Sequence, residues 1–455
     1  MNPSSKHRSR DPLILGAGIS GQGAATLLAS RGQSFTISDM RKPEAALVQE
    51  LTALPVPVHI HSGPDLPEPE DIGRLIVSPG IRPDHPLVQA CLQAGLPVGT
   101  EVDLALEGFN GPTIGVTGTN GKSTTCIMVA AMLRAAGIKA VACGNLGEPP
   151  SAILARDQDP GTLVIELSSY QLHYGPGVSC DHACFTSLSH DHVDWHGSPE
   201  AYLRAKWRLV ENLGSGGTLV IGGDIIRQAT ALGLRIPEHV QQEVLTPWNE
   251  TPTRGEWFLE NGCLRQADGP TITDWQDHGL ESWHDQWNAS MAWLVSRQQT
   301  GQSVPDTGDW QPLPWRCQPV GTRAGFPVIN DSKSTNLEST LAALRGRPGR
   351  WHLLIGGEGK GESFAPLAGL SRQLASIILF GASAGKLADD VRSSAIPLHR
   401  FATLQEAMDR IAALTDPDPA GILFSPGCAS FDEFANFSER GRFFNAAIAP
   451  LLDNS

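Results

Sequence analysis

The stretch that decides the fold is Thr-Ile-Gly-Val-Thr-Gly-Thr-Asn-Gly-Lys-Ser-Thr, residues 113–124. It opens as a short apolar strand and ends where a helix is expected to begin, near Ser123. Between the two lie a pair of glycines and Lys122. Such a loop binds phosphate, because glycines let backbone N–H groups approach phosphate oxygens and the helix N-terminus adds a partial positive charge. The stretch therefore predicts a nucleotide triphosphate site in an α/β domain.

The side chains of this loop have individual roles in such a site. Lys122 can reach the β- and γ-phosphates, and Ser123 or Thr124 can bind Mg²⁺ through a hydroxyl. The remaining loop residues would surround the phosphates with their backbone, and they are Gly118, Thr119, Asn120 and Gly121. The generic pattern has glycine where this chain has Val116, so a helix start behind a chance Gly-Lys pair is the competing interpretation. The order of strand, loop and helix favours the phosphate site.

Length and composition describe a globular chain with several cores. The chain has 455 residues, of which 40% are hydrophobic, and a net charge of −14, and this length predicts about two to four domains. This net negative charge disfavours nucleic-acid binding, which needs basic patches. The eight cysteines form no CxxC pair, so we expect reduced, mostly buried thiols. No apolar run approaches the ~18 residues of a membrane helix, and no signal-peptide pattern is present, which predicts a soluble cytoplasmic protein without membrane insertion.

The N-terminal part begins with a βαβ unit. A strand at Leu13–Leu15 leads into the turn Gly-Ala-Gly-Ile-Ser-Gly that starts at Gly16, then a helix to about Arg31 and a strand at Phe35–Asp39. This is the pattern of a Rossmann-like domain. Asp39 lies 23 residues after Gly16, near the place where a dinucleotide enzyme has the acid that binds ribose. On this part alone, a nicotinamide- or flavin-dependent oxidoreductase is an alternative.

In the middle of the chain, further polar groups follow two expected strands. Glu166 ends an apolar run, and a carboxylate at a strand end suits Mg²⁺. The expected strand Ala183–Leu188 precedes Ser-His-Asp-His-Val-Asp-Trp-His at 189–196, and Lys206 lies in the helix that comes next. The histidine-rich stretch is close to the ligand pattern of zinc hydrolases, although its last histidine comes one position late. A zinc hydrolase would leave the phosphate loop unexplained.

Repeated alternation of strands and helices predicts parallel sheets with helices on their faces. In residues 214–274 the helical signals thin out and short β-like runs suggest an insertion at a sheet edge. In the last part, three loops follow expected strands, namely Asn330–Asn336, Gly356–Lys360 and Ser425–Asp432. Each supplies backbone donors together with a cation or hydroxyls, as an anionic substrate requires.

Together these motifs resemble the Mur ligases, over about residues 13–444. The most specific pieces are the phosphate loop, Glu-Leu-Ser-Ser-Tyr-Gln-Leu at 166–172, Asp-His-Val-Asp at 191–194, Lys206, Asn330–Asn336, and Ser425–Asp432 with Asn436-Phe437. The resemblance implies three α/β domains. Residues 1–108 would form a Rossmann-like domain that binds a UDP-sugar, and residues 109–312 a central ATP-binding domain with an edge β-sheet insertion. Residues 313–455 would form a Rossmann-like domain that binds the amino acid.

The resemblance also implies a reaction. Mur ligases form an amide bond by way of an acyl phosphate, with ATP and Mg²⁺, here expected as two ions. The segment Asn330–Asn336 is similar to the member that adds glutamate to UDP-N-acetylmuramoyl-L-alanine in cytoplasmic peptidoglycan synthesis. We expect D-glutamate, with L-glutamate as the alternative, and a monomer. A regulatory protein with a degenerate nucleotide site is disfavoured, because Lys122, Glu166 and His192 are all present.

The resemblance carries roles onto individual residues. The catalytic groups would be Lys122, Glu166, His192, Lys206 and Lys333, and the Mg²⁺ ligands would be Ser123, Glu166, His192 and Lys206 in carbamylated form. Besides the phosphate loop, ATP would contact Asn288, Arg316 and Asp331. The UDP-substrate would contact Gly18, Ile19, Ser20, Asp39, Arg41, Ser78, Pro79, Gly80 and Asn145. Glutamate would contact Thr335, Lys360, Ser430, Phe431 and Phe437.

Two positions depart from the family pattern. The last domain starts with Pro-Trp-Arg, with Trp315 in place of the usual histidine. The family's His-Asn pair before the adenine-contacting asparagine reads His-Asp here, and Asp285 cannot donate a hydrogen bond as asparagine does. Adenine packing is therefore expected to differ locally.

Overall fold

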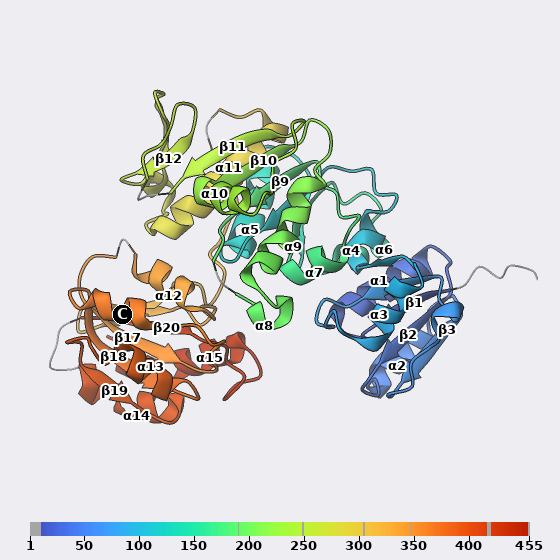
Figure 1. Cartoon of the computed structure of the whole chain (residues 1–455). Coiled ribbons are helices and arrows are strands. Elements are labelled where there is room, and N and C mark those ends of the chain that lie inside the picture. The colour runs from blue at the N-terminus through green and yellow to red at the C-terminus, as the bar shows by residue number, and fades with distance from the viewer. Residues whose placement is uncertain are drawn as a thin grey trace, which may run out of the picture. The chain divides into compact units, whose positions relative to one another are not determined.

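The computed structural model describes residues 11–189, 191–247, 250–303, 305–345, 347–415 and 420–453. Two compact units can be separated by their internal contacts. The first contains residues 1–279 and 287–310, and the second contains residues 280–286 and 311–455. The first unit holds two sheets and the second holds one, so the chain has three α/β parts, as predicted (Figure 1). The domain boundaries given above stay predictions.

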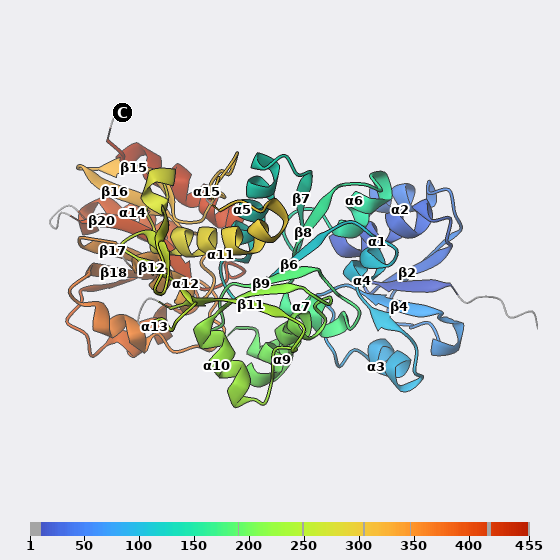
Figure 2. The same ribbon diagram turned by 90° about the horizontal axis from the view of Figure 1, so that it is seen from above.

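The N-terminal sheet has five parallel strands in the order β3-β2-β1-β4-β5. They are β1 (Pro12–Leu15), β2 (Phe35–Asp39), β3 (Val58–Ser62), β4 (Arg74–Val77) and β5 (Val98–Gly99). Helices α1 (Ile19–Ser30) and α2 (Ala45–Thr52) cover one face and α3 (Pro86–Gln93) covers the other (Figure 2). This is the doubly wound order, whose direction reverses between β1 and β4.

The central sheet has the order β14-β13-β12-β11-β10-β9-β6-β8-β7. Its strands are β6 (Thr113–Thr117), β7 (Ala140–Gly144), β8 (Thr162–Glu166), β9 (His182–Phe185), β10 (Thr218–Gly222), β11 (Gln241–Thr246), β12 (Trp257–Glu260), β13 (Cys263–Gln266) and β14 (Thr271–Asp274). Pairing is parallel from β7 to β12 and antiparallel between β12, β13 and β14. The helices are α5 (Lys122–Ala135), α6 (Pro150–Arg156), α7 (Ser169–Tyr174), α8 (Val193–His196), α9 (Pro199–Glu211), α10 (Gly223–Ala231) and α11 (Trp283–Thr300).

For residues 214–274, the predicted sheet at the edge is confirmed, but the region also contains a helix, α10, that the weak helical signals did not indicate. Strands β12 to β14 form an antiparallel edge, but β10 and β11 belong to the main parallel sheet, and α10 lies between them. This helix begins without a side-chain cap and buries only Ile225 and Ala229. Two buried positions one turn apart are too weak a periodic signal to identify a helix from sequence.

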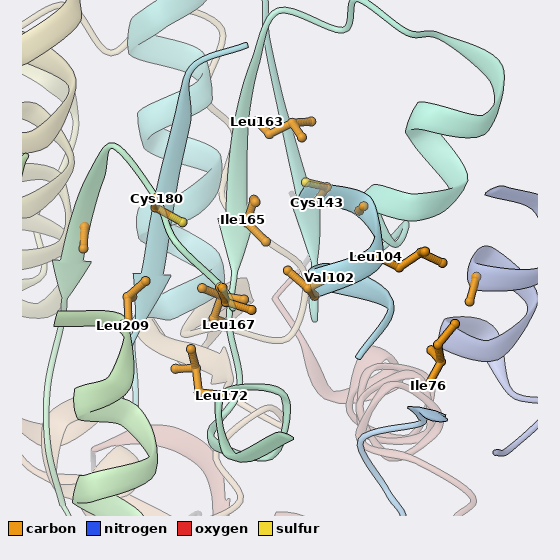
Figure 3. Close-up of a cluster of buried hydrophobic side chains, with 14 of the residues drawn as sticks. Ile76, Val102, Leu104, Cys143, Leu163, Ile165, Leu167, Leu172, Cys180 and Leu209 are labelled. Atoms are coloured by element: carbon orange, nitrogen blue, oxygen red, sulfur yellow. The ribbon is translucent and has the colours of Figure 1, made fainter. Parts of the chain in front are cut away.

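One hydrophobic cluster joins the first two sheets of the first unit (Figure 3). The short helix α4 (Glu101–Leu106) connects β5 to β6, and its Val102 and Leu104 lie between Ile76 of β4 and Ile165 of β8. A fully buried side chain of this size stabilises a fold by about 1.5–3 kcal/mol. Helix α4 is therefore a packed element and not a loose linker.

The C-terminal sheet has the order β15-β16-β20-β17-β18-β19, with only β15 antiparallel. The strands are β15 (Gln318–Arg323), β16 (Phe326–Asn330), β17 (Trp351–Gly356), β18 (Leu374–Phe380), β19 (Leu398–Arg400) and β20 (Gly421–Gly427). The helices are α12 (Leu337–Leu344), α13 (Ala384–Val391), α14 (Leu404–Thr415) and α15 (Phe437–Ile448). Along β17, Leu353 packs into one core and Leu354 into the other, as the alternation of side chains in a strand requires.

Short 3-10 turns complete the described elements, at Pro69–Asp71, Trp275–His278, Ala365–Leu370 and Ala449–Leu451. Within the described ranges, no helix combines the length and the apolar character that crossing a membrane requires. Six of the eight cysteines are buried as free thiols, which confirms the expectation, and Cys263 and Cys317 are half-buried.

Candidate active site

The phosphate loop connects β6, in the middle of the central sheet, to α5, and its two glycines are required by close contacts. Gly118 has φ +146°, and a Cβ there would lie 2.1 Å from Thr186 Oγ1. Gly121 has φ +83°, and a Cβ there would lie 2.4 Å from Asn288 Oδ1. Any larger residue would collide with these two side chains. Asn288, predicted to contact ATP, thus lies directly against the loop.

Two lysine side chains donate hydrogen bonds to backbone carbonyls of this loop. Lys122 Nζ donates to Thr119 O at 2.7 Å, and Lys206 Nζ donates to Gly118 O at 2.7 Å. Lys206 is 1% exposed and lies 4.7 Å from the ring centre of Tyr202. Burial lowers the pKa of Lys206 well below its ordinary value, and the nearby Lys122 lowers it further, while Asp191 and Glu166 act in the opposite direction. Burial therefore disfavours the charged form of the Lys206 amine.

Glu166 ends β8, next to β6 in the sheet, in register with Val116. Its side chain is 2% exposed, and its Oε1 accepts a hydrogen bond of 2.8 Å from Asn145 Nδ2. The backbone N–H of Asn145 also donates to Glu166 O at 2.9 Å. The carboxylate is thus held at the edge of the sheet where the phosphate loop lies, and Asn145, predicted to contact the UDP-substrate, holds it there.

The loop after β9 brings a histidine and an aspartate to the same edge. His192 has φ +52°, its backbone N–H donates to Asp191 Oδ1 at 2.9 Å, and its Nε2 lies 3.5 Å from Asp191 Oδ2. Its Nδ1 lies 2.5 Å from the hydroxyl oxygen of Tyr170. His190, part of the same sequence motif, lies outside the described residues. Strands β6, β8 and β9 are neighbours, so their carboxyl ends gather the phosphate loop, Glu166 and His192.

The chemistry of these groups fits a magnesium nucleotide. Ser123, Glu166 and His192 offer a hydroxyl, a carboxylate and an imidazole, and the two loop glycines leave the loop N–H groups without a neighbouring side chain of their own. Mg²⁺ is usually held by one or two protein groups together with substrate phosphates. In the part of the chain that the structure describes, no group of three or more His, Cys, Asp or Glu side chains is arranged to hold a metal ion alone.

At the N-terminal sheet, the predicted UDP contacts lie at the carboxyl ends of β1, β2 and β4. Gly16 has φ +100°, and its carbonyl accepts a hydrogen bond of 3.1 Å from Ser78 Oγ. Asp39 accepts from the backbone N–H of Ala17 at 2.9 Å and of Arg41 at 2.9 Å. The turn after β1 is thus joined to both neighbouring loops. Of the remaining predicted contacts, Gly18 precedes α1, Ile19 and Ser20 form the start of α1, and Pro79 and Gly80 follow β4; Ile19 is 71% exposed.

In the second unit, the three loops predicted to bind ligands follow the adjacent strands β16, β20 and β17. Asp331, after β16, is buried, and its carboxylate accepts hydrogen bonds from Cys317 N at 3.1 Å and from Ser425 Oγ at 2.8 Å. Burial raises the pKa of Asp331, while Arg316 acts to lower it. Asp331 therefore ties the loop after β16 to β20 and lies near Arg316.

The predicted glutamate contacts occupy the same edge of this sheet. Lys333 Nζ lies 4.1 Å from the ring centre of Phe437, a cation–π contact. Ser430 is buried and Phe431 is 71% exposed, although they are neighbours in the loop after β20. Two further candidates, Thr335 and Lys360, lie on the loops after β16 and β17, half-buried and exposed respectively.

Comparison with known proteins places the chain in a family. The family described as Mur ligase middle domain matches residues 116–238, and that described as Mur ligase MurD-like, N-terminal domain matches residues 10–100. UDP-N-acetylmuramoylalanine--D-glutamate ligase of Nitrosococcus oceani is 33% identical and covers 97% of this chain and 96% of the relative. The protein of the same name from Lactiplantibacillus plantarum is 35% identical, covering 99% and 98%. This chain belongs to the Mur ligase family.

Solved structures support the Mur ligase fold independently. MurF ligase from Thermotoga maritima in complex with ADP matches 97% of this chain and 98% of that chain, with a TM-score of 0.59 at 14% identity. MurF from Acinetobacter baumannii covers 96% and 93%, with a TM-score of 0.60 at 17% identity. The family resemblance read from the sequence motifs is therefore confirmed, and the alternative of a Rossmann-type oxidoreductase is not favoured. The chain is an ATP-dependent ligase that forms amide bonds.

One residue of this Mur ligase that sequence reasoning missed is Arg440 of α15, which is 1% exposed. Its Nη1 donates to the carbonyls of Cys428 at 3.0 Å and Ala429 at 3.1 Å. Its Nη2 donates to Ser332 O at 2.9 Å, and its Nε to Ser332 Oγ at 3.2 Å. Burial lowers its pKa to about 10. Arg440 thus joins the loops after β16 and β20, and an arginine in a helix gives no sequence signal for this role.

The two departures from the family pattern have local explanations. Trp315 has φ +64° and packs against Gly441 of α15, where a Cβ would lie 2.6 Å from its ring. Asp285, in the first turn of α11, accepts a hydrogen bond of 2.6 Å from Ser282 Oγ. Both side chains have structural contacts within the second unit.

Proposed function

We propose that this Mur ligase joins D-glutamate to UDP-N-acetylmuramoyl-L-alanine with conversion of ATP to ADP and phosphate. The proposal is supported by near full-length similarity to proteins named for this reaction. The observation that carries it is the gathering of Glu166, His192 and the buried Lys206 around the phosphate loop. A plain nucleotide-binding domain needs the loop but not a buried lysine beside a carboxylate and a histidine.

The reaction must overcome the poor reactivity of a carboxylate toward an amine. A carboxylate oxygen of UDP-N-acetylmuramoyl-L-alanine attacks the γ-phosphorus of ATP, the bond between this phosphorus and ADP breaks, and an acyl phosphate forms. The glutamate amine then attacks the carbonyl carbon, loses a proton, and inorganic phosphate leaves. Anionic groups approach one another in both steps, so neutralising charge is the main task of the site.

Individual residues have separate tasks under this proposal. Lys122 and the loop N–H groups neutralise and orient the phosphates, and Mg²⁺, expected as two ions, would be held by Ser123, Glu166, His192 and modified Lys206. Bound Mg²⁺ supplies charge neutralisation for the transferred phosphoryl group. Lys333 would orient the reacting groups.

We also propose that Lys206 is carbamylated. Its neutral amine would add to the carbon of CO₂ and lose a proton, which leaves an anionic carbamate. Burial lowers the pKa of the Lys206 amine, which favours this reaction, because only an unprotonated amine is nucleophilic. Loading the enzyme with ¹³C-bicarbonate should give a carbamate carbonyl signal in wild type and none in Lys206→Ala.

Substrates would be divided among three domains with the predicted boundaries, residues 1–108, 109–312 and 313–455. The UDP part would bind Asp39, Arg41 and the loops around Gly18–Ser20 and Ser78–Gly80. ATP would contact Asn288, Arg316 and Asp331 besides the phosphate loop. Glutamate would contact Thr335, Lys360, Ser430, Phe431 and Phe437. We place the enzyme in the cytoplasm as a monomer.

The test is phosphate release with UDP-N-acetylmuramoyl-L-alanine and ATP, comparing D-glutamate with L-glutamate. We expect release with the D-isomer. Faster release with L-glutamate would support the L-specific alternative, and no release with either isomer would reject the ligase assignment. Lys122→Ala should abolish release, whereas Lys139→Ala, which changes an exposed lysine paired with Asp157, should not.

A further inference from the structure

The hydroxyl of Tyr170 contacts the imidazole of His192, and the proposed function assigns no role to this tyrosine. Tyr170 Oη and His192 Nδ1 are 2.5 Å apart, and the two ring centres are 4.8 Å apart at an interplanar angle of 55°. The two residues come from different elements, Tyr170 from α7 after β8 and His192 from the loop after β9. The contact therefore joins the segment that carries Glu166 to the segment that carries His192.

The tyrosine ring is held firmly. Helix α7 begins with a capping box in which Ser168 and Gln171 satisfy each other's backbone N–H groups. The ring of Tyr170 packs against Trp195 at 4.6 Å and stacks on His196 at 5.7 Å with an interplanar angle of 17°. A ring packed on two aromatic neighbours cannot turn its hydroxyl away from His192 without moving α8.

The position of the proton on His192 decides whether its imidazole can bind a cation. A neutral imidazole carries one N–H and one lone pair. If Nδ1 carries the hydrogen and donates it to Tyr170 Oη, the lone pair is on Nε2, the nitrogen that faces Asp191 Oδ2 at 3.5 Å. If the tyrosine donates to Nδ1, Nε2 carries the hydrogen and cannot be a ligand.

A cation on the Nε2 side of the ring selects the first arrangement, because only that arrangement leaves a lone pair on Nε2; without a cation, the Asp191 carboxylate would favour the hydrogen on Nε2. The Asp191 side chain is 8% exposed, so its negative charge lies on the Nε2 side of the ring with little solvent around it. A cation bound there would meet a lone pair and a carboxylate together. Histidines that bind metals usually donate their second ring N–H to a neighbouring oxygen, which fixes the tautomer and the ring orientation.

We propose that Tyr170 is a positioning residue for the magnesium site: its hydroxyl accepts the Nδ1–H of His192 and keeps the Nε2 lone pair directed at the cation. The proposal rests on the proposed role of His192 as a Mg²⁺ ligand. It adds a residue of the Glu-Leu-Ser-Ser-Tyr-Gln-Leu segment to the metal site, so that one segment supplies both a ligand and the group that orients a second ligand.

The decisive variant is Tyr170→Phe, which removes the hydroxyl and keeps the packed ring. The matched control is Tyr174→Phe in the same helix, whose hydroxyl donates to Ile81 O at 2.9 Å, away from His192. Binding of Mn²⁺ in the presence of a non-hydrolysable ATP analogue, measured by electron paramagnetic resonance, reports the site without turnover. We expect about tenfold weaker Mn²⁺ binding in Tyr170→Phe, as for other groups that orient metal-binding histidines, and wild-type binding in Tyr174→Phe.

A second readout follows the tautomer directly. Ring ¹⁵N chemical shifts of the enzyme with Mg²⁺ and the same ATP analogue, with His192 assigned by its loss in His192→Gln, should show the hydrogen on Nδ1. A hydrogen on Nε2 in the presence of Mg²⁺, or wild-type Mn²⁺ affinity in Tyr170→Phe, would overturn the proposal.

Mn²⁺ binding by His192→Gln distinguishes a failure of the Tyr170 role from a failure of the His192 metal assignment. If His192→Gln weakens Mn²⁺ binding and Tyr170→Phe does not, the positioning role alone is rejected. If His192→Gln binds Mn²⁺ like wild type, the metal assignment under the proposed function is rejected as well.

Discussion

Replacing Gly121 by alanine tests the central feature of the site, the close approach of the phosphate loop to Asn288. Gly121 has φ +83° and Gly137, at the end of α5, has φ +78°. Alanine would therefore be strained to a similar extent at both positions. A Cβ at Gly121 would lie 2.4 Å from Asn288 Oδ1, whereas a Cβ at Gly137 would have no atom within 4 Å. Gly137→Ala is thus a matched control for the backbone strain.

The magnitudes follow from these contacts. A non-glycine residue in the left-handed region costs about 1–2 kcal/mol, so both variants should lose that much stability. At Gly121 the Asn288 side chain must also move about 1 Å to restore an ordinary contact. This movement breaks its 3.4 Å hydrogen bond with Thr125 Oγ1, which costs about 1 kcal/mol more. A displacement of about 1 Å at a nucleotide contact should raise the KM for ATP at least tenfold.

The assay combines thermal unfolding with steady-state phosphate release. We expect both variants to melt below wild type, but only Gly121→Ala to lose the ATP-dependent rise in Tm and to show the raised KM, because ligand stabilisation depends on affinity. A KM for ATP in Gly121→Ala within about twofold of wild type, or an equal rise of this KM in Gly137→Ala, would refute a steric effect of the Cβ on Asn288.

Three further predictions concern other parts of the chain. Burial raises the pKa of the Glu101 carboxyl to about 7 from an ordinary 4.5, so the folded state binds more protons than the unfolded state between these values and stability falls as pH rises through that window. The Tm of Glu101→Gln should therefore equal that of wild type near pH 5 and exceed it at pH 8. Equal Tm values of the two proteins at both pH values would contradict the raised pKa of Glu101. Asp39→Asn replaces one acceptor by a donor facing the backbone N–H of Ala17 or Arg41, and should raise the KM for the UDP-substrate about tenfold without changing that for ATP. Lys206→Ala should lower kcat at least about a hundredfold, and normal turnover would exclude a role in the site.

The parallel strands and the loops at their ends could be predicted from sequence because their signals are local. Phe35–Asp39 was predicted as a strand and is β2 with the same bounds. Loops that follow neighbouring parallel strands must share one edge of the sheet, so Glu166 and the phosphate loop were expected together. Helix α10 was missed because its apolar signal is only two buried residues.

Contacts between side chains far apart in sequence could not be predicted. Tyr170 and His192 are separated by 22 positions, and their hydrogen bond depends on how α7 turns after β8. Arg440 bonds to Ser332, 108 positions away, and nothing in its own helix reveals that it is buried. Such residues are determined by tertiary packing, whereas composition and periodicity describe only neighbours along the chain.

The buried guanidinium of Arg440 also matters for redesigning the enzyme toward other amino acids. Its N–H groups meet three carbonyls and one hydroxyl, and a lysine ammonium has neither the number nor the planar arrangement of donors to replace it. A mutant library should therefore keep Arg440 and Ser332 constant and vary Thr335, Ser430 and Phe431. Chimeras between relatives should exchange α15 together with the loops after β16 and β20, because a crossover between them would separate the arginine from its acceptors.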